Sequence, residues 1–183
     1  HNISLIEAPL AAALGHGVDA DDPSGDLVVD IGGGKLDVAL ISLGGIVLSK
    51  SSPIAGNEFD KAVSEYIRKK FGIIIGERTA EEIKIRIGSS ASDEMEETME
   101  VKGRGISDGL PVHIYISSAD VNEALEQPIE AVVNTIHEVL ADTPPELSSD
   151  LFDRGIILTG GGSLVRGLAQ RIQNRIGIEV KLV

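Results

Sequence analysis

Short apolar runs separated by glycine-rich turns predict three neighbouring strands early in the chain. Residues 27–31 form one such run, which ends in three consecutive glycines. Residues 38–41 and 46–48 follow at short spacing, with Gly44 and Gly45 between them. Connections of this length join antiparallel strands, so the pattern predicts a three-stranded meander.

Apolar residues at spacings of three and four predict the helices. Asn57 can cap a helix that Gly72 closes, and Thr79 and Glu82 have the spacing of a capping box for the next helix. The helices predicted in this part of the chain cover residues 9–14, 57–71, 79–87 and 118–140.

The remaining segments predict a hairpin and a strand–helix–strand unit. Residues 99–102 and 112–116 alternate apolar and polar positions around a glycine-rich turn, which is typical of a hairpin with one solvated face. Residues 155–159, 164–176 and 178–183 predict a strand, a helix and a strand. The whole order predicts an α/β fold in which helices flank a mixed sheet.

Composition narrows the class of protein. Hydrophobic residues make up 42% of the 183 residues and charged residues 25%, as in a folded globular domain. The net charge of −13 argues against a nucleic-acid partner, and the absence of cysteine excludes disulfides and thiol catalysis. No run approaches the ~18 apolar residues of a membrane-spanning helix, so we expect no direct membrane insertion.

The first glycine triplet, Gly32, Gly33 and Gly34, follows Asp30 at the end of a predicted strand. Without Cβ atoms, such a turn lets backbone N–H groups close on a phosphate. An acidic residue just before it suits a hydrated Mg²⁺ held through water, which makes Asp30 the candidate metal-binding residue. The alternative is a tight hairpin whose glycines only provide positive φ angles.

The second triplet, Gly160, Gly161 and Gly162, also follows a predicted strand, and Ser163 and a predicted helix come directly after it. A helix N-terminus has free N–H groups and a partial positive charge, so this turn suits a phosphate or a ribose–adenine contact. The alternative is an ordinary strand-to-helix turn capped by Ser163. Neither triplet has the residues of a Walker A loop or of the G-x-G-x-x-G fingerprint.

Glu81 and Lys84 form the third candidate group, because residues three positions apart on a helix share a face. They can contact a ribose hydroxyl and an adenine edge. The alternative is an ion pair between the two side chains in solvent. We expect both glycine triplets to end on neighbouring strands and to face one anion-sized hollow.

Six segments, in this order, resemble the MreB family of bacterial actin-like proteins and together span essentially the whole chain. They are residues 5–15, 28–34, 41–47, 75–81, 143–147 and 153–162. The two glycine turns are generic to the actin, Hsp70 and sugar-kinase superfamily. The segments Glu77-Arg78-Thr79-Ala80-Glu81 and Thr143-Pro144-Pro145-Glu146-Leu147 point to MreB.

The resemblance implies an actin-like, ribonuclease-H-like fold with a mixed five-stranded sheet flanked by helices and a small α+β insertion. It implies subdomain IIA at residues 1–75 and 118–183, and subdomain IIB at residues 76–117. The first glycine triplet would be the phosphate-2 loop, and Glu81 and Lys84 the ribose-side contacts. The second triplet with Ser163 would be the adenosine loop.

The resemblance also implies what the whole protein does. It would bind ATP or ADP with Mg²⁺, polymerise into filaments, and organise cell-wall synthesis and rod shape in bacteria. It would lie in the cytoplasm at the inner face of the membrane. Its second half would dock the membrane protein RodZ.

Two departures from the family pattern bear on hydrolysis. The family reads Glu-Glu-Pro where this chain has Glu7-Ala8-Pro9, so Ala8 replaces the residue expected to polarise the attacking water. It reads Gly-Gly-Gly-Thr-Thr where this chain has Lys35 and Leu36 after the triplet. The Ala side chain has no basic group, and the Lys ammonium cannot accept a proton from water, so we expect no hydrolysis here. Lys35 then either contacts a γ-phosphate as a point charge or, with Leu36, is a surface substitution.

The chain starts with His1 rather than Met, and residues 2–6 already have the pattern of a short buried strand. No phosphate-1 loop of the Asp-x-Gly-Thr type is present. We therefore expect a piece of a longer protein, with weak or undetectable ATP affinity on its own. One alternative is an engineered or isolated actin-like half that pairs into a homodimer through an exposed cleft wall. Another is half of an Hsp70-like or sugar-kinase-like ATPase or phosphotransferase.

Overall fold

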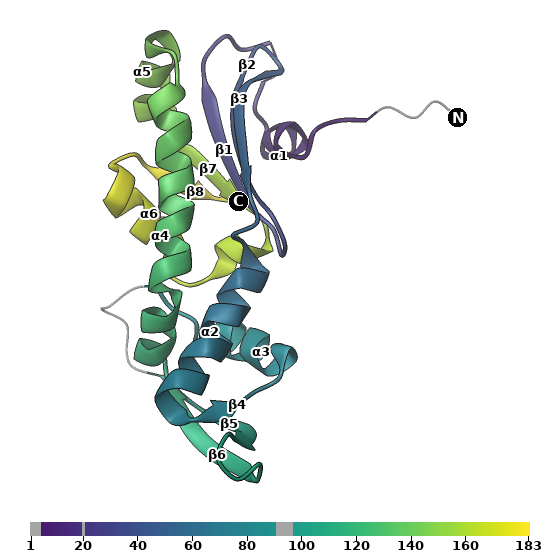
Figure 1. Cartoon of the computed structure of the whole chain (residues 1–183). Coiled ribbons are helices and arrows are strands. Elements are labelled where there is room, and N and C mark those ends of the chain that lie inside the picture. Colours follow the sequence, from purple (N-terminus) through teal and green to yellow (C-terminus); the bar gives the residue numbers. More distant parts are fainter. Residues whose placement is uncertain (1–4, 20, 91–96) are drawn as a thin grey trace.

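The computed structural model describes residues 5–19, 21–90 and 97–183, and its larger sheet is mixed and five-stranded. The strand order is β3–β2–β1–β7–β8 (Figure 1). β1 pairs with β2, and β2 with β3, in antiparallel fashion, whereas β1–β7 and β7–β8 are parallel. The strands are β1 Asp26–Ile31, β2 Leu36–Ser42, β3 Gly45–Ser52, β7 Ile156–Thr159 and β8 Val180–Leu182. The predicted mixed sheet flanked by helices is confirmed.

Helices cover the two faces of this sheet unequally (Figure 1). The long helix α4, Ser118–Asp142, lies along one face, where Val29 joins the main buried core. The short helix α1, Ala8–His16, lies on the other face, and Ala13 belongs to a smaller core cluster there with Val28. Successive residues of a strand point to opposite faces, so the strand pattern decides which side chains meet each helix.

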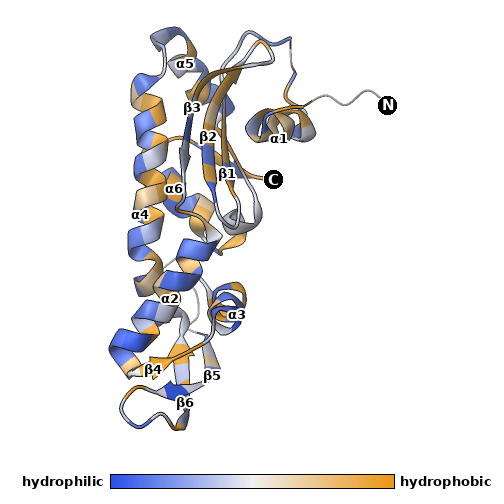
Figure 2. Ribbon diagram, turned by 45° about the vertical axis from the view of Figure 1, so that its right-hand side comes forward, coloured by the Kyte–Doolittle hydropathy of each residue, from blue (hydrophilic) through white to orange (hydrophobic). Residues whose placement is uncertain are grey.

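The second part of the fold is built on a small sheet with the order β4–β5–β6 (lower part of Figure 1). Figure 2 shows hydrophobic residues along β1 and β2, and many hydrophilic ones on α2, which leads to the small sheet. β4 lies before residue 76, and the division into subdomains IIA and IIB stays a prediction. The elements are α2 Gly56–Phe71, β4 Ile73–Ile74, α3 Glu77–Ile87, β5 Thr98–Gly105 and β6 Pro111–Ser117.

Two helix starts differ from the predictions. α2 has no side-chain cap, so the prediction that Asn57 caps it is wrong, because its first N–H groups reach the first glycine triplet instead. α3 begins at Glu77 without a side-chain cap, so the predicted capping box of Thr79 and Glu82 is wrong as well. The end of α2 at Gly72 is confirmed.

The C-terminal part differs in two further places. Residues Pro145–Arg154 form a helix, α5, that the paired prolines concealed, although Pro suits a first helical turn. After β7 the chain forms a short 3₁₀ turn, η1, at Gly161–Leu164, and α6 covers only Leu168–Ile176. The prediction that the second glycine triplet opens an α-helix is therefore wrong.

The predicted buried strand at residues 2–6 lies partly outside the described residues. Of its described members, Leu5 and Ile6 are 97% and 54% exposed and belong to no strand, so that prediction is wrong for them. No helix in the described part of the chain combines the length and the apolar composition of a membrane-spanning segment.

Candidate functional site

The two glycine triplets lie side by side at the ends of neighbouring strands. β1 and β7 are parallel, and Asp30 is in register with Thr159. Gly160 has a φ of +88°, and a Cβ there would lie 2.5 Å from the carbonyl oxygen of Ile31. A Cβ on Gly162 would lie 2.5 Å from the Cγ2 atom of Ile31. Only glycine permits such a close approach between the two turns. The strand pairing and these short distances confirm the expectation that both turns meet at one place.

The N-terminus of α2 holds the first triplet from one side. The Gly56 N–H donates to the Gly32 carbonyl at 3.0 Å, and the Asn57 N–H donates to the Gly33 carbonyl at 2.7 Å. The Gly32 N–H donates to the Lys35 carbonyl at 2.9 Å, which closes the turn. Backbone hydrogen bonds within the turn and from the helix N-terminus therefore set the position of this turn.

A cavity of about 380 Å³ opens between the glycine turns, α2 and α3. Residues of both triplets border it together with Glu81 and Lys84, and its volume is in the range of small-molecule sites. The residues that line it are Gly32, Gly33, Gly56, Asn57, Asp60, Glu81, Lys84, Ile85, Gly161, Gly162, Leu164 and Val165.

Lys84 connects α3 to α2 at the cavity wall. Its Nζ lies 2.8 Å from Asp60 Oδ1 and donates to the Gly56 carbonyl oxygen at 3.3 Å. The side chains of Lys84 and Asp60 are only 12% and 16% exposed. Burial raises the pKa of Asp60, and the neighbouring Lys84 offsets this only in part. Lys84 thus pairs with Asp60 rather than with the exposed Glu81.

Five predicted site residues are not among the described residues that line the cavity: Asp30, Gly34, Lys35, Gly160 and Ser163. Gly160 provides the left-handed backbone of the second turn. The Ser163 side chain is buried, and its hydroxyl donates to the Gly160 carbonyl oxygen within the same turn. These two residues stabilise the conformation of the second turn without lining the cavity.

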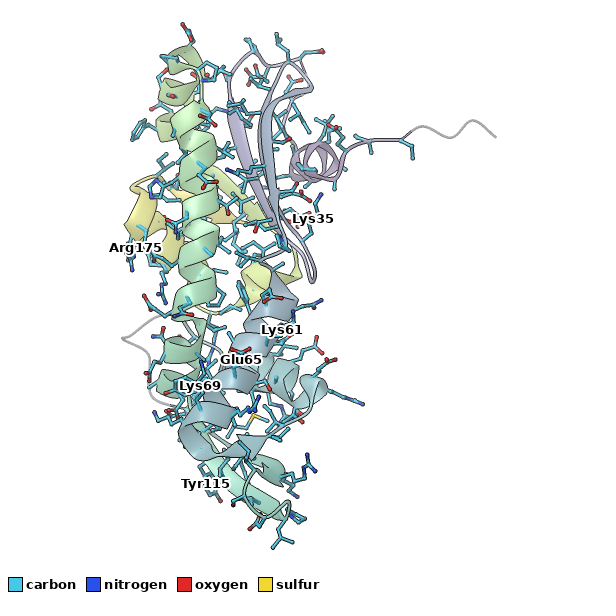
Figure 3. The ribbon with its side chains drawn as sticks, in the orientation of Figure 1. Lys35, Lys61, Glu65, Lys69, Tyr115 and Arg175 are labelled. Atoms are coloured by element: carbon cyan, nitrogen blue, oxygen red, sulfur yellow. The ribbon has the colours of Figure 1, made fainter. Side chains whose placement is uncertain are left out.

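Asp30 and Asp37 are register partners across β1 and β2. Val29, beside Asp30, faces the main core, so Asp30 points to the α1 face of the sheet. Lys35 Nζ lies 2.8 Å from Asp37 Oδ1, which also accepts a hydrogen bond from the Ser51 hydroxyl. Figure 3 shows Lys35 beside the hairpin of β1 and β2, on the side away from α4. Burial and the charge of Asp37 raise the pKa of Asp30, and Lys35 counteracts them.

These residues do not fit the hydrated Mg²⁺ predicted beside Asp30. Carboxylate oxygens are the ligands that Mg²⁺ prefers. One oxygen of Asp37 is already engaged by an ammonium and a hydroxyl, and the ammonium of Lys35 repels a second cation. Within the described residues, no group of three or more His, Cys, Asp or Glu could hold a metal ion.

The two departures from the family pattern occupy different environments. Ala8 is exposed at the start of α1 and has no titratable group. Leu36 is fully buried in the main core, so the interpretation of it as a surface substitution is wrong. The Lys35 side chain is 62% exposed.

Sequence reasoning missed half of the cavity wall. Asn57 and Asp60 have the same three-residue spacing that singled out Glu81 and Lys84, so that signal was available. Ile85 is 70% exposed at the cavity, which no local pattern indicates, because apolar residues are expected inside.

Two neighbouring strands of a mixed five-stranded sheet end in glycine turns at one cavity, with a small α+β unit beside it. This combination defines an actin-like half-domain. The family described as MreB/Mbl protein matches residues 1–183. The chain belongs to this MreB/Mbl family.

Individual relatives agree with the family match. Mbl of Bacillus subtilis is 44% identical over 179 residues, which is 98% of this chain and 54% of Mbl. MreB of Escherichia coli is 43% identical over 178 residues, which is 97% of this chain and 51% of that protein. The crystal structure of MreB5 of Spiroplasma citri bound to AMPPNP aligns with a TM-score of 0.93 at 39% identity, covering 96% of this chain and 53% of that chain. The chain thus spans about half the length of the curated relatives it matches.

Proposed function

We propose that this chain is the nucleotide-binding half of an actin-like filament protein, and that ATP or ADP binds against its two glycine turns. The observation that carries the proposal is the cavity of about 380 Å³ bordered by both triplets, Glu81 and Lys84. The relative MreB5, which is described as bound to AMPPNP, supports it. The match to the MreB/Mbl family over the whole chain favours it over an Hsp70-like or sugar-kinase-like half.

Different walls of the cavity suit different parts of a nucleotide. At Gly33 and Gly161, phosphate oxygens can approach the backbone because no Cβ intervenes. Ile85 and Leu164 are 70% and 69% exposed at the cavity, which offers an adenine ring an apolar surface. The exposed Glu81 carboxylate can accept hydrogen bonds from ribose hydroxyls.

The nucleotide is bound without hydrolysis in this proposal. Ala8 cannot take a proton from water, and Lys35 has donors only. Lys35 directly follows the first triplet in the sequence, and its exposed ammonium can meet a phosphate as a point charge. Nucleotide binding is weak in the isolated chain, because the opposite wall of the nucleotide-binding cleft would belong to the rest of the protein.

In the whole protein, nucleotide binding accompanies self-association into filaments that organise cell-wall synthesis and rod shape. Exposed apolar side chains at both ends of the molecule support such contacts. Leu43 directly follows β2 and Phe152 belongs to α5, and they are 67% and 69% exposed. Leu110 directly precedes β6 and Tyr115 belongs to it, and they are 60% and 70% exposed. α5 and the small sheet lie at opposite ends of the molecule (Figure 1). The filaments lie in the cytoplasm at the inner face of the membrane, where a RodZ-like membrane protein docks.

The test is ATP affinity in the full-length protein, measured with a fluorescent ATP analogue. Gly161→Val places a side chain in the open part of the cavity, since an added Cβ there meets no described atom within 4 Å. We expect at least about a tenfold loss of affinity, which corresponds to about 1.4 kcal/mol. Gly45→Val is the matched control, because Gly45 lies at the start of β3, away from the cavity. Equal affinities for the two variants would overturn the proposal.

A further inference from the structure

Two carboxylates face each other behind the first glycine turn. Asp30 and Asp37 are directly opposite in the antiparallel pair β1–β2. Side chains at such positions have Cβ atoms about 4.5–5.5 Å apart, and like charges there repel. Both residues are partly buried, which strengthens the repulsion because less solvent screens it. A positive charge beside them offsets this repulsion.

Lys35 supplies this charge from the turn that joins the two strands. Its Nζ lies 2.8 Å from Asp37 Oδ1, to which the Ser51 hydroxyl also donates. The Lys35 side chain is 62% exposed and the Asp37 side chain only 14%. The ammonium therefore covers the carboxylate from the solvent side, which is the side from which a dissolved cation would arrive.

We propose that Lys35 is a built-in cation, whose ammonium takes the place of a divalent metal beside Asp30 and Asp37 and keeps metal from binding at the first glycine turn. Burial and the charge of Asp37 raise the pKa of Asp30, and the charge of Lys35 acts in the opposite direction, as the charge of a metal ion would. The proposal deepens the proposed function, since the carboxylates belong to the same turn. It implies that the negative charge of a nucleotide meets a fixed ammonium at this turn.

The experiment uses Mn²⁺ as a paramagnetic probe, which broadens amide NMR signals near its binding site. The 183-residue chain and its Lys35→Thr variant are titrated without nucleotide. We expect the signals of residues 30–37 to lose at least half of their intensity in Lys35→Thr at a Mn²⁺ concentration that leaves them unchanged in the wild type. Each residue is compared with itself, because other acidic surfaces of a chain of net charge −13 also attract Mn²⁺.

Two further variants distinguish the effect of the ammonium at position 35 from the effect of the net charge of the chain. Lys35→Arg keeps a cation next to Asp37 and should behave like the wild type. Lys50→Thr removes one positive charge from β3, where Lys50 pairs with Glu138, and should leave residues 30–37 unbroadened. Any of three results would overturn the proposal. Mn²⁺ could broaden the signals of residues 30–37 equally in the wild type and in Lys35→Thr, or it could broaden them more in Lys50→Thr or in Lys35→Arg than in the wild type.

Failure of this proposal is distinguishable from failure of the proposed function. The Mn²⁺ titration contains no nucleotide, whereas the Gly161→Val experiment measures ATP affinity. Loss of ATP affinity in Gly161→Val together with Mn²⁺ broadening in the wild type would retain the nucleotide site and overturn the role of Lys35.

Discussion

Lys84 in α3 and Asp60 in α2 form an ion pair at the cavity wall, with 2.8 Å between Nζ and Oδ1. Lys84 also donates to the carbonyl oxygen of Gly56, the first residue of α2. The Gly56 N–H in turn donates to the first glycine triplet. One lysine thus links α3, which carries Glu81, to the turn proposed to hold phosphate.

Removing the carboxylate should destabilise the fold. We expect Asp60→Ala to lower the free energy of unfolding by about 3 kcal/mol, because no side-chain oxygen of residue 60 then faces the largely buried Lys84 ammonium, whatever the protonation state of the wild-type carboxyl. Glu82→Ala is the control on the same helix, since Glu82 pairs with Arg86 and both side chains are more than 40% exposed. That variant should change stability by less than about 1 kcal/mol. Urea unfolding measures both, and equal losses would contradict the importance of the buried pair.

The contribution of Asp60 should depend on pH. Burial raises the pKa of Asp60, so the folded protein holds this proton more tightly than the unfolded chain. Such a group contributes stability that is complete below its unfolded pKa and is lost as the pH rises through the folded pKa. The wild type should therefore be more stable relative to Asp60→Asn at about pH 4 than at about pH 7. Urea unfolding at both pH values measures this difference, and a constant difference would refute the shift.

The second glycine turn offers a test of close packing. Gly160 has a φ of +88°, and a Cβ there would lie 2.4 Å from Asp30 Oδ1. We expect Gly160→Ala to cost about 3 kcal/mol through backbone strain and overpacking. At the next residue, a Cβ on Gly161 would have no atom of the described residues within 4 Å. Gly161→Ala should therefore lower the free energy of unfolding by less than about 1 kcal/mol. Thermal unfolding followed by circular dichroism compares them, and similar melting temperatures would contradict this packing.

The strands and glycine turns could be predicted because their signals are local. An apolar run followed by three glycines predicted a strand at residues 27–31, and β1 covers Asp26–Ile31. The expectation that the two turns meet is explained by the strand order of the structure, since β1 and β7 are parallel neighbours and their carboxyl ends lie at one edge. Glu81 and Lys84 line one cavity wall as their helical spacing predicted.

The rest could not be predicted because it depends on packing between distant segments. The partner of Lys84 is Asp60 on another helix, and the two helices bury Phe59 and Ile83 in the same core. The alternative that Lys35 and Leu36 are both surface substitutions fails for Leu36, because strand alternation directs its side chain into the core. α5 was hidden because prolines that end one helix can also begin the next.

Restoring the family residues should restore hydrolysis in the full-length protein. We expect Ala8→Glu combined with Lys35→Thr to raise phosphate release from ATP by about 100-fold, in line with the contribution of a positioned general base. Ala11→Glu combined with Lys35→Thr is the control, because it adds a carboxylate at another exposed position of α1. Phosphate release by the wild type at the rate of the restored variant would contradict the proposal that this chain binds without turnover.

Arg154 joins the end of α5 to the start of β1 at the opposite end of the larger sheet from the cavity. Its Nε and Nη2 donate to the two carboxylate oxygens of Asp26 at 2.8 and 2.9 Å. Its Nη1 donates to Asp22 Oδ2 at 2.8 Å. The Asp26 side chain is only 7% exposed, so this guanidinium, rather than solvent, faces both of its carboxylate oxygens.

Arg154→Met should therefore lower the free energy of unfolding by about 3 kcal/mol, because the buried Asp26 carboxylate loses its partner. Arg154→Lys should recover only part of this loss. A guanidinium donates two parallel hydrogen bonds to a carboxylate, whereas an ammonium acts as a point charge without this paired geometry. Arg175→Met is the control, because Arg175 and its partner Glu130 are 49% and 40% exposed, and it should cost less than about 1 kcal/mol. Urea unfolding orders the three variants, and full recovery by Arg154→Lys would show that charge alone, without the paired geometry, holds α5 to β1.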